Sequence, residues 1–369
     1  MKQMFWYFVV VLLQDSSFQL GLERRMHILP KTSLIFPKNH HSPGCIAKTL
    51  RDELALLASS TDNRKMCKVN AEIGRLLEST ITILLGSGDN DRFFDKSNPV
   101  IKLSNEFAYA EIVPLLIGHL KLLSFESKKK VALIFINLMK RKIGFKSPTA
   151  EIMRVNKNLV ADLIYGYDHP DIAQVCGIML RECARHEQLA KTILEMNEFY
   201  HLMSFMEHPS FEIAGDAYNT FKTFILSNKT MTASFLYTNY KQFFENFDYL
   251  VSSDNYLTRR QAFEILRTLL KEPENQKVAD KFLKDPKHLR RVMWALRDNS
   301  SVIQLEAFDI FLYFLDHPKR PRTIQRILEK NREKLLQFMD QFLVVKKNDP
   351  ESAVIKEEVL KKISAIGVN

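Results

Sequence analysis

Apolar residues recur along this chain at three- and four-residue spacings, which is the pattern of amphipathic helices, and the strict alternation typical of half-buried strands is almost absent. Five segments share one design, in which a turn-forming residue is followed by about fifteen residues of amphipathic helix. These segments cover residues 125–139, 169–183, 209–225, 254–270 and 299–315. The pattern therefore predicts an all-α protein.

The centres of these five predicted helices repeat at a nearly constant interval. The aligned residues are Ile134, Cys176, Ala217, Ala262 and Ala307, which are 42, 41, 45 and 45 residues apart. Most of them are small, which lets neighbouring helices approach closely. The interval matches the roughly 40–47 residues of HEAT and armadillo units, which stack to bury their apolar faces. We therefore predict an armadillo/HEAT-like helical-repeat solenoid, curved as a horseshoe, over residues 35–369.

The N-terminus departs from this pattern. Residues 4–13 form an apolar run behind Lys2, similar to the core of a signal peptide. The run is too short to cross a bilayer, and no small-x-small cleavage site follows it, so a secreted chain is the less favoured alternative. We predict that residues 1–34 are an atypical extension, either disordered or a start-site artefact with Met26 as another start.

The charge of the chain indicates what kind of partner to expect. Lys and Arg number 53 against 43 Asp and Glu, a formal net charge of +10. Such an excess indicates an acidic peptide, a nucleic acid or an anionic membrane. Residues 286–334 carry half of the excess, with aromatic side chains such as Trp294 between the cations. In a solenoid this region predicts a partly apolar groove with a basic rim, which suits an acidic-aromatic peptide.

Candidate zinc motifs are incomplete in this sequence. His186 and Glu187 begin like a zinc-protease helix, but Ala190 stands where the second histidine is required. Cys176 and Cys183 are seven residues apart and so share a helix face. No second Cys/His pair lies at zinc spacing, which favours two buried, reduced thiols.

Other catalytic and metal-binding signatures also fail. The acidic segment 86–98 resembles a calcium loop, but the required glycine at the sixth position and glutamate at the twelfth are missing. The sequence holds no Walker, GxGxxG, GxSxG or kinase signature. We therefore predict no catalytic residue, no metal and no cofactor, in a protein that is not an enzyme.

Three stretches of the sequence point to a known family. They are CGIMLRECARHEQLA at 176–190, NYLTRRQ at 255–261 and IQLEAF at 303–308. Through them the chain resembles the calcium-binding protein 39 family, also called mouse-protein-twenty-five scaffolds. The resemblance implies an armadillo-like horseshoe that binds a STE20-related pseudokinase, stabilises its closed conformation and, with it, activates a tumour-suppressor serine/threonine kinase. It also implies direct activation of STE20-type serine/threonine kinases by a monomeric, cytoplasmic scaffold.

The resemblance further implies a peptide pocket near the C-terminal end, in which family members hold a Trp-Glu-Phe tail of the pseudokinase. Arg260 matches the residue that pairs with the glutamate of the tail, and Met293 matches a wall of the aromatic pocket. Lys330 is placed to meet the terminal carboxylate. Pro273 and Gln276 stand where family members have an Arg and a Phe that touch the third kinase, which puts recruitment of that kinase in doubt.

A helical-repeat RNA-binding protein is the alternative function that the net charge and the solenoid suggest. Such proteins read bases with stacking and edge-contacting side chains at fixed positions of every repeat. The corresponding positions vary from repeat to repeat here, for example at 128–130, 171–173 and 257–259. We therefore predict a protein partner and expect neither a nucleic acid nor a membrane.

Overall fold

Helices make up all of the regular structure that is described. The computed structural model describes residues 42–86, 98–142, 147–342 and 350–367. No strand occurs in these ranges, so the prediction of an all-α protein is confirmed. The predicted extension, residues 1–34, lies outside the described residues and stays a prediction.

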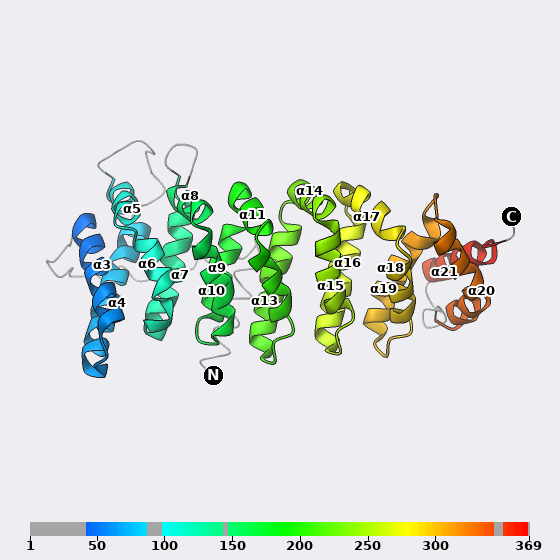
Figure 1. The fold of residues 1–369 in the computed structure, drawn as a ribbon, viewed down its shortest axis with the longest axis horizontal. Helices are drawn as coiled ribbons and strands as arrows, with labels where there is room; N and C mark the ends of the chain where they lie inside the picture. The colour runs from blue at the N-terminus through cyan, green and yellow to red at the C-terminus, as the bar shows by residue number, and fades with distance from the viewer. Residues whose placement is uncertain (1–41, 87–97, 143–146, 343–349, 368–369) are drawn as a thin grey trace. The chain divides into compact units, whose positions relative to one another are not determined.

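Residues Pro43–Asn369 form one compact unit, and within the described ranges short turns join consecutive helices (Figure 1). The α-helices are α3 (Pro43–Ser59), α4 (Asn63–Gly86), α5 (Pro99–Tyr109), α6 (Ile112–Gly118), α7 (Phe125–Lys140), α8 (Pro148–Val155), α9 (Lys157–Tyr165), α10 (Ala173–Cys183), α11 (Glu187–Leu194), α12 (His201–Phe205), α13 (Phe211–Leu226), α14 (Lys229–Thr238), α15 (Tyr240–Val251), α16 (Tyr256–Lys271), α17 (Gln276–Leu283), α18 (Pro286–Ala295), α19 (Ser301–Asp316), α20 (Arg322–Phe342) and α21 (Pro350–Ser364). The short 3-10 helices are η1 (Leu120–Leu122), η2 (Gly166–Asp168), η3 (Asn197–Tyr200) and η4 (Pro273–Asn275).

The five predicted repeats are confirmed as α7, α10, α13, α16 and α19. These helices follow one another in chain order along the array (Figure 1), and each packs on the next. The residue aligned at the centre of each helix is at most 1% exposed. Equivalent helices therefore bury equivalent central residues as they stack, and the chain is a helical-repeat solenoid.

Polar residues at the turns begin several of the repeated helices. The side-chain oxygens of Ser124, Asn255 and Ser300 accept hydrogen bonds from backbone N–H groups in the first turns of α7, α16 and α19. Each bond satisfies an N–H that the helix leaves unpaired. The predicted segment opens with a turn-forming residue at 169, and the helix α10 begins later than predicted, at Ala173. The reason is a turn in which the His169 carbonyl accepts from the N–H groups of Ile172 and Ala173.

A single cluster of buried apolar residues runs through the repeats, from Ile46 to Ile366. Its middle is aromatic, with the ring of Phe221 stacked on Phe199 at 5.6 Å and on Phe243 at 6.3 Å between centroids. All three rings are fully buried, which stabilises the fold by roughly 1.5–3 kcal/mol for each. The continuity of this core is expected for repeats that cannot bury their apolar faces alone.

Ion pairs also join each repeat to the next, and we call this set the ion-pair ladder. Its four rungs are Lys128–Asp171, Arg181–Asp216, Lys222–Glu264 and Arg267–Glu306. In each rung the cation lies on one repeated helix, and the carboxylate lies on the following repeated helix or in the turn before it. The ladder thus follows the same stack of helices as the apolar core.

The rung between α10 and α13 is the most buried. Arg181 Nη2 lies 3.0 Å from Asp216 Oδ1, and the Tyr167 hydroxyl donates to Asp216 Oδ2 at 2.6 Å. Arg181 also donates to the Thr220 hydroxyl at 2.6 Å. Burial and the nearby Asp216 raise the pKa of Tyr167 well above its ordinary value, so this hydroxyl keeps its proton. A Cβ at Gly177 would lie 1.8 Å from Asp216 Oδ2, which explains the glycine at this close approach.

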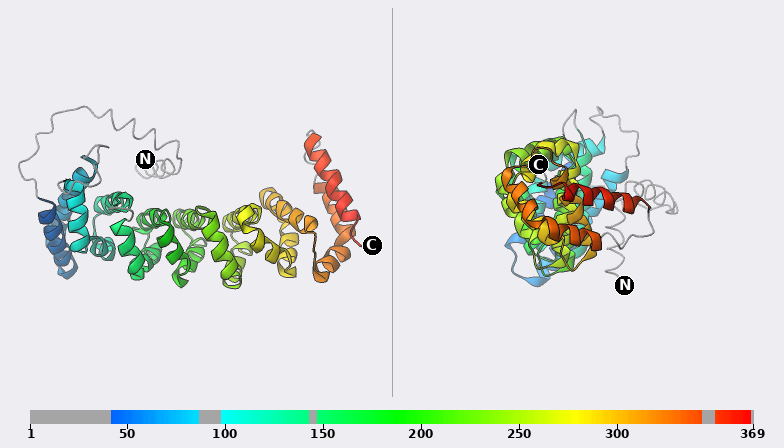
Figure 2. Two further views of the ribbon diagram at one scale, coloured as in Figure 1. Left: turned by 90° about the horizontal axis from the view of Figure 1, so that it is seen from above. Right: turned by 90° about the vertical axis from the view of Figure 1, so that its right-hand side faces the viewer.

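The C-terminal end of the array is formed by α20 and α21. These two helices pack on each other, and α20 also contacts α18. Figure 2 shows both helices beyond α19 at the C-terminal end. The face of α20 that packs on the core carries Ile324, Leu328, Leu335 and Met339. Its opposite face is left to solvent.

Candidate partner-binding site

The three residues predicted to hold a partner's tail lie on three neighbouring helices. Arg260 lies on α16, Met293 on α18 and Lys330 on α20. These helices are connected by packing, because α16 and α18 both contact α19, and α18 contacts α20. Arg260 and Lys330 are exposed, and Met293 is half-buried against the core. Their role in binding stays a prediction.

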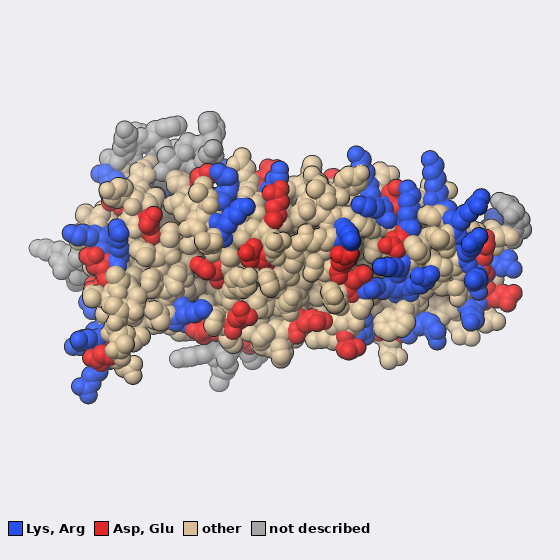
Figure 3. Space-filling view, viewed as in Figure 1, with Lys and Arg blue, Asp and Glu red and all other residues tan. Residues whose placement is uncertain are grey.

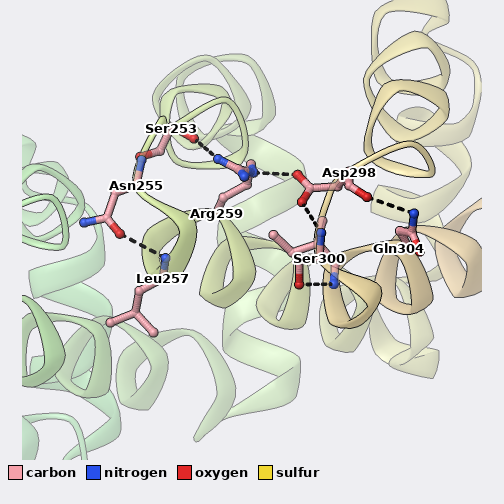
Figure 4. A network of polar contacts seen from close by, with 8 residues as sticks. Ser253, Asn255, Leu257, Arg259, Asp298, Ser300 and Gln304 are labelled. Atoms are coloured by element: carbon pink, nitrogen blue, oxygen red, sulfur yellow. Dashed lines mark hydrogen bonds and ion pairs between the residues drawn. The ribbon is translucent and has the colours of Figure 1, made fainter.

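The start of α16 is fixed by a network around Arg259 (Figure 4). Arg259 Nε lies 2.9 Å from Asp298 Oδ2, and its Nη1 donates to the Ser253 carbonyl at 2.6 Å. The backbone N–H of Ser300 donates to Asp298 Oδ1 at 2.9 Å, and the Gln304 amide donates to the Asp298 carbonyl at 2.8 Å. Arg259 therefore ties the turn before α16 to the turn before α19.

Arg260 is the next residue and does something different. No ion pair holds its guanidinium within the part of the chain that the structure describes, and the side chain is exposed. Glu264 lies one turn further along α16, but it pairs with Lys222 at 2.6 Å. Burial alone would raise the pKa of Glu264; Lys222, Tyr218 and Arg260 nevertheless hold it below its ordinary value. The network around Arg259 fixes the helix, and the charge of Arg260 remains available to a ligand.

The helix α18 presents apolar surface beside its cations. Its first turn is fixed by the Asp285 carboxylate, which accepts from the backbone N–H of Lys287 at 2.8 Å. Arg291 pairs with Asp248 at 3.3 Å and so ties α18 to α15. Met293 packs against the core, whereas Trp294 is 61% exposed. The half-buried thioether and the exposed indole are each a suitable contact for an aromatic side chain.

Lys330 and the two departures from the family pattern are all surface positions. Lys330 is exposed on α20, and it forms no hydrogen bond or ion pair among the described residues. Pro273 begins η4 and Gln276 begins α17, and both side chains are exposed. The two substitutions therefore alter a surface and leave the core unchanged.

A cleft of about 950 Å³ was not foreseen from the sequence. It is lined by Glu207, Glu245, Asn246, Asp248, Tyr249, Ser252, Ser253, Asp254, Asn255 and Arg291. Burial raises the pKa of Asp248 although Arg291 opposes the shift. The cleft is rich in carboxylates, unlike the basic region beside it. The polar turn 252–255 is its only sequence signal, because the other walls come from separate repeats.

The cysteines of α10 are structural. Cys176 and Cys183 are free and buried, as predicted. Burial raises the pKa of the Cys176 thiol to about 12, and it raises the pKa of Cys183 as well. Both thiols therefore stay protonated at neutral pH, and a thiolate is the form that attacks or binds metals.

The other candidate motifs give no centre either. Within the described ranges no cluster of His, Cys, Asp and Glu side chains is arranged to hold a metal. Burial, aided by Lys142 and Arg185, lowers the pKa of His186. Most of the segment 86–98 lies outside the described residues. No helix within the described ranges is both long and apolar enough to cross a membrane.

Charge is distributed unevenly over the molecule. Figure 3 shows Lys and Arg side chains gathered over the C-terminal third, around α17 to α20, while both signs are mixed over the preceding repeats. This is the region that holds Met293 and Lys330, with Arg260 on the neighbouring α16. Cations are therefore concentrated at this end, and the partly apolar groove that they were expected to border stays a prediction.

Comparisons with known proteins identify the family. The sequence profile described as Mo25-like matches residues 34–367. Human calcium-binding protein 39-like is 37% identical over 329 residues, which cover 89% of this chain and 96% of that protein. MO25-like protein 2 of Caenorhabditis elegans is 37% identical over 337 residues, covering 90% of this chain and 99% of that protein.

More distant proteins share the similarity. The Mo25-like protein of Schizosaccharomyces pombe is 30% identical over 334 residues, which cover 90% of this chain and all of that protein. A solved designed armadillo repeat protein gives a TM-score of 0.40 at 13% identity, over 72% of this chain and 99% of that one. The sequence relatives match nearly their whole length, and the resemblance found in the sequence is confirmed. This chain belongs to the Mo25-like family.

Proposed function

We propose that this chain is a scaffold that binds a STE20-related pseudokinase or a STE20-type serine/threonine kinase and stabilises its active conformation. The observation that carries the proposal is the match to the Mo25-like family over residues 34–367. The repeat fold supports it, because stacked helices offer a long, continuous surface to a folded partner. The proposal does not extend to a third kinase, since Pro273 and Gln276 replace the residues expected to touch it.

We assign the partner's C-terminal Trp-Glu-Phe tail to Arg260, Met293 and Lys330. The exposed guanidinium of Arg260 is suited to a charge-assisted hydrogen bond with the glutamate of the tail. Met293 supplies a flexible apolar contact for an aromatic ring, with Trp294 next to it. Lys330 supplies a point charge for the terminal carboxylate. An arginine with aromatic anchors is a common composition of a binding hot spot.

Activation by such a scaffold is a population shift. A kinase alternates between open and closed conformations, and a scaffold that binds the closed one more tightly raises its share. A hundredfold preference for the closed state multiplies the closed-to-open ratio by about a hundred, which corresponds to about 2.7 kcal/mol. The chain needs no catalytic residue for this role, in agreement with its lack of catalytic signatures.

The tail site is tested by titrating a labelled peptide ending in Trp-Glu-Phe. We expect the wild-type chain to bind it and Arg260→Glu to weaken binding at least tenfold, because a hot-spot residue contributes about 2 kcal/mol or more. Lys102→Glu is the matched control, since Lys102 is an exposed cation on the distant α5. Equal binding by wild type and Arg260→Glu, or no binding by wild type, would reject the site.

Activation needs its own measurement. We expect the phosphorylation rate of a STE20-type kinase to rise when the wild-type chain is added, and to rise less with Arg260→Glu if the kinase carries the tail. A single-stranded RNA titrated in parallel tests the alternative function, which is RNA binding. RNA binding tighter than peptide binding, with no effect on the kinase, would favour the alternative.

A further inference from the structure

The helix α20 carries a row of four cations at every fourth position. They are Arg322, Arg326, Lys330 and Lys334, and all four are exposed. Residues four apart are neighbours on a helix surface, so the row forms a continuous ridge, inclined to the helix axis, over about 18 Å. We call this row the basic stripe.

The basic stripe forms no contact that would stabilise the described part of the fold. Its residues lie opposite the buried face of α20, and no carboxylate among the described residues forms an ion pair with any of them. Like charges four residues apart destabilise a helix. Arg322, the first residue of α20, also opposes the helix dipole. Cations that destabilise their own helix and lack a partner among the described residues point to a ligand.

The surroundings of the stripe are polar and include both signs of charge. Thr323, Glu329 and Glu333 are exposed beside it, and the Gln325 amide donates to Glu329 at 3.0 Å. No aromatic residue occurs between positions 319 and 337. The stripe is therefore a narrow row of positive charge with carboxylates next to it, within the basic end seen in Figure 3.

We propose that the basic stripe binds an extended acidic segment of a partner protein, with carboxylates at alternate positions. Consecutive cations of the stripe are about 6 Å apart along the helix axis. Alternate residues of an extended chain point to the same side and are about 6.6 Å apart. Successive carboxylates of such a segment therefore meet successive cations, and the complementary charge supplies the attraction.

Other anionic ligands fit this row less well. An acidic helix would need an apolar seam beside the stripe, where Thr323, Glu329 and Glu333 stand instead. Single-stranded nucleic acids are held by cations together with stacking aromatic rings, and aromatic rings are missing from this stretch of α20.

The stripe extends beyond the proposed tail site. Only Lys330 belongs to both, while Arg322 and Arg326 lie one and two turns before it on α20. A partner could therefore use either surface without the other. Reversing Arg322 and Arg326 tests the stripe and leaves the three tail residues intact.

The test uses the full chain and a labelled sixteen-residue peptide of alternating Glu and Ser, with a Gln-Ser peptide for comparison. We expect wild type to bind the Glu-Ser peptide, and to bind it more weakly as the salt concentration rises. The Gln-Ser peptide should not bind. The double variant Arg322→Glu/Arg326→Glu should raise the dissociation constant at least tenfold. Lys48→Glu/Lys102→Glu, exposed cations of α3 and α5, should change it less than twofold.

Several results would overturn the proposal. They are no binding of the Glu-Ser peptide by wild type, equal binding by the stripe variant, and stripe-dependent binding that is tighter for single-stranded DNA or phosphatidylserine vesicles. The Trp-Glu-Phe peptide is titrated against the same variants, and the stripe variant should bind it within twofold of wild type. Failure of one peptide and success of the other separates this proposal from the proposed function.

Discussion

The cations of the repeated helices and the cations of α20 are used in opposite ways. In the ion-pair ladder each Lys or Arg has a carboxylate on the next repeat, and the rung at Arg181 is almost enclosed. In the basic stripe four exposed cations have no such carboxylate among the described residues. Residue type alone therefore does not reveal a cation's role. What decides it is whether a counter-charge lies within reach in the fold.

The same contrast occurs between two adjacent residues. Arg259 is held by Asp298 and the Ser253 carbonyl, and its side chain is 14% exposed. Arg260, one position further, is exposed and unpaired within the described residues. Neighbouring residues on a helix face different directions, so a single turn of α16 holds one structural and one available arginine. Substitutions at both kinds of cation test this distinction.

Removing the buried rung should have the largest effect. Arg181→Ala leaves the Asp216 carboxylate buried without its counter-charge, and we expect a loss of about 3–5 kcal/mol in the free energy of unfolding. Urea denaturation measures it. Lys222→Ala removes a half-exposed rung and should cost below about 1 kcal/mol. Equal losses for the two variants would contradict the view that burial decides how much a rung contributes.

His288 shows a third case, a buried ring that stays neutral at neutral pH although its Nε2 lies 4.0 Å from the Asp285 carboxylate. Its ring stacks on Phe282 at 3.9 Å and lies 3.2 Å from the Tyr240 hydroxyl. Burial, aided by Arg291 and Lys287 and opposed by Asp285, lowers the pKa of His288 to about 4. Histidine in the unfolded chain has a pKa of about 6.5, so between this pH and about 4 the unfolded chain binds a proton that the folded chain does not bind.

The pH dependence follows from this difference. The contribution of His288 to stability is complete above about pH 6.5 and is lost as pH falls toward 4, by about 3 kcal/mol in all. Chemical denaturation between these pH values measures the slope. His288→Phe should flatten it, since Phe cannot take up a proton. An unchanged slope in this variant would mean that other groups cause the dependence.

Much of the fold follows from the sequence because burial repeats with the helices. Ala217, Ala262 and Ala307 occur 45 residues apart, and each is fully buried at the centre of its repeated helix. The partners in the ladder could not be predicted, because they lie some forty residues apart and depend on the register between helices. The late start of α10 was missed for a local reason, the turn closed by the His169 carbonyl.

The candidate site was predictable in a different way. Single exposed residues such as Arg260 and Lys330 carry no periodic signal, so only the resemblance to a family pointed to them. The acidic cleft escaped prediction because Glu207, Asp248 and Asp254 come from separate turns and helices. The basic stripe is readable from its four-residue spacing, but its interpretation depends on the structure, in which no carboxylate of the described ranges pairs with it.

The two adjacent arginines of α16 provide a closely matched comparison. Arg259→Ala should cost about 2 kcal/mol of unfolding free energy, because Asp298 is almost fully buried and loses a charged partner. Arg260→Ala should change that free energy by less than about 0.5 kcal/mol. The same variant should bind the Trp-Glu-Phe peptide more weakly than wild type. Denaturation and peptide titration of both variants measure the four values. A large stability loss for Arg260→Ala would show that it has a structural role.

The stripe should give the smallest effect, and one of opposite sign. Arg322→Glu removes the like-charge contact with Arg326 and replaces a cation at the first position of α20 by an anion, which the helix dipole favours. We expect the free energy of unfolding to rise by about 0.5 kcal/mol, and Arg322→Gln to give a smaller rise. Denaturation at low salt measures both, since salt screens the terms involved. A surface residue kept for stability would lose stability on charge reversal, so a fall of similar size would mean that Arg322 has a partner within the chain. A gain, together with loss of the acidic peptide, is the result expected if the stripe weakens its own helix in order to hold a ligand.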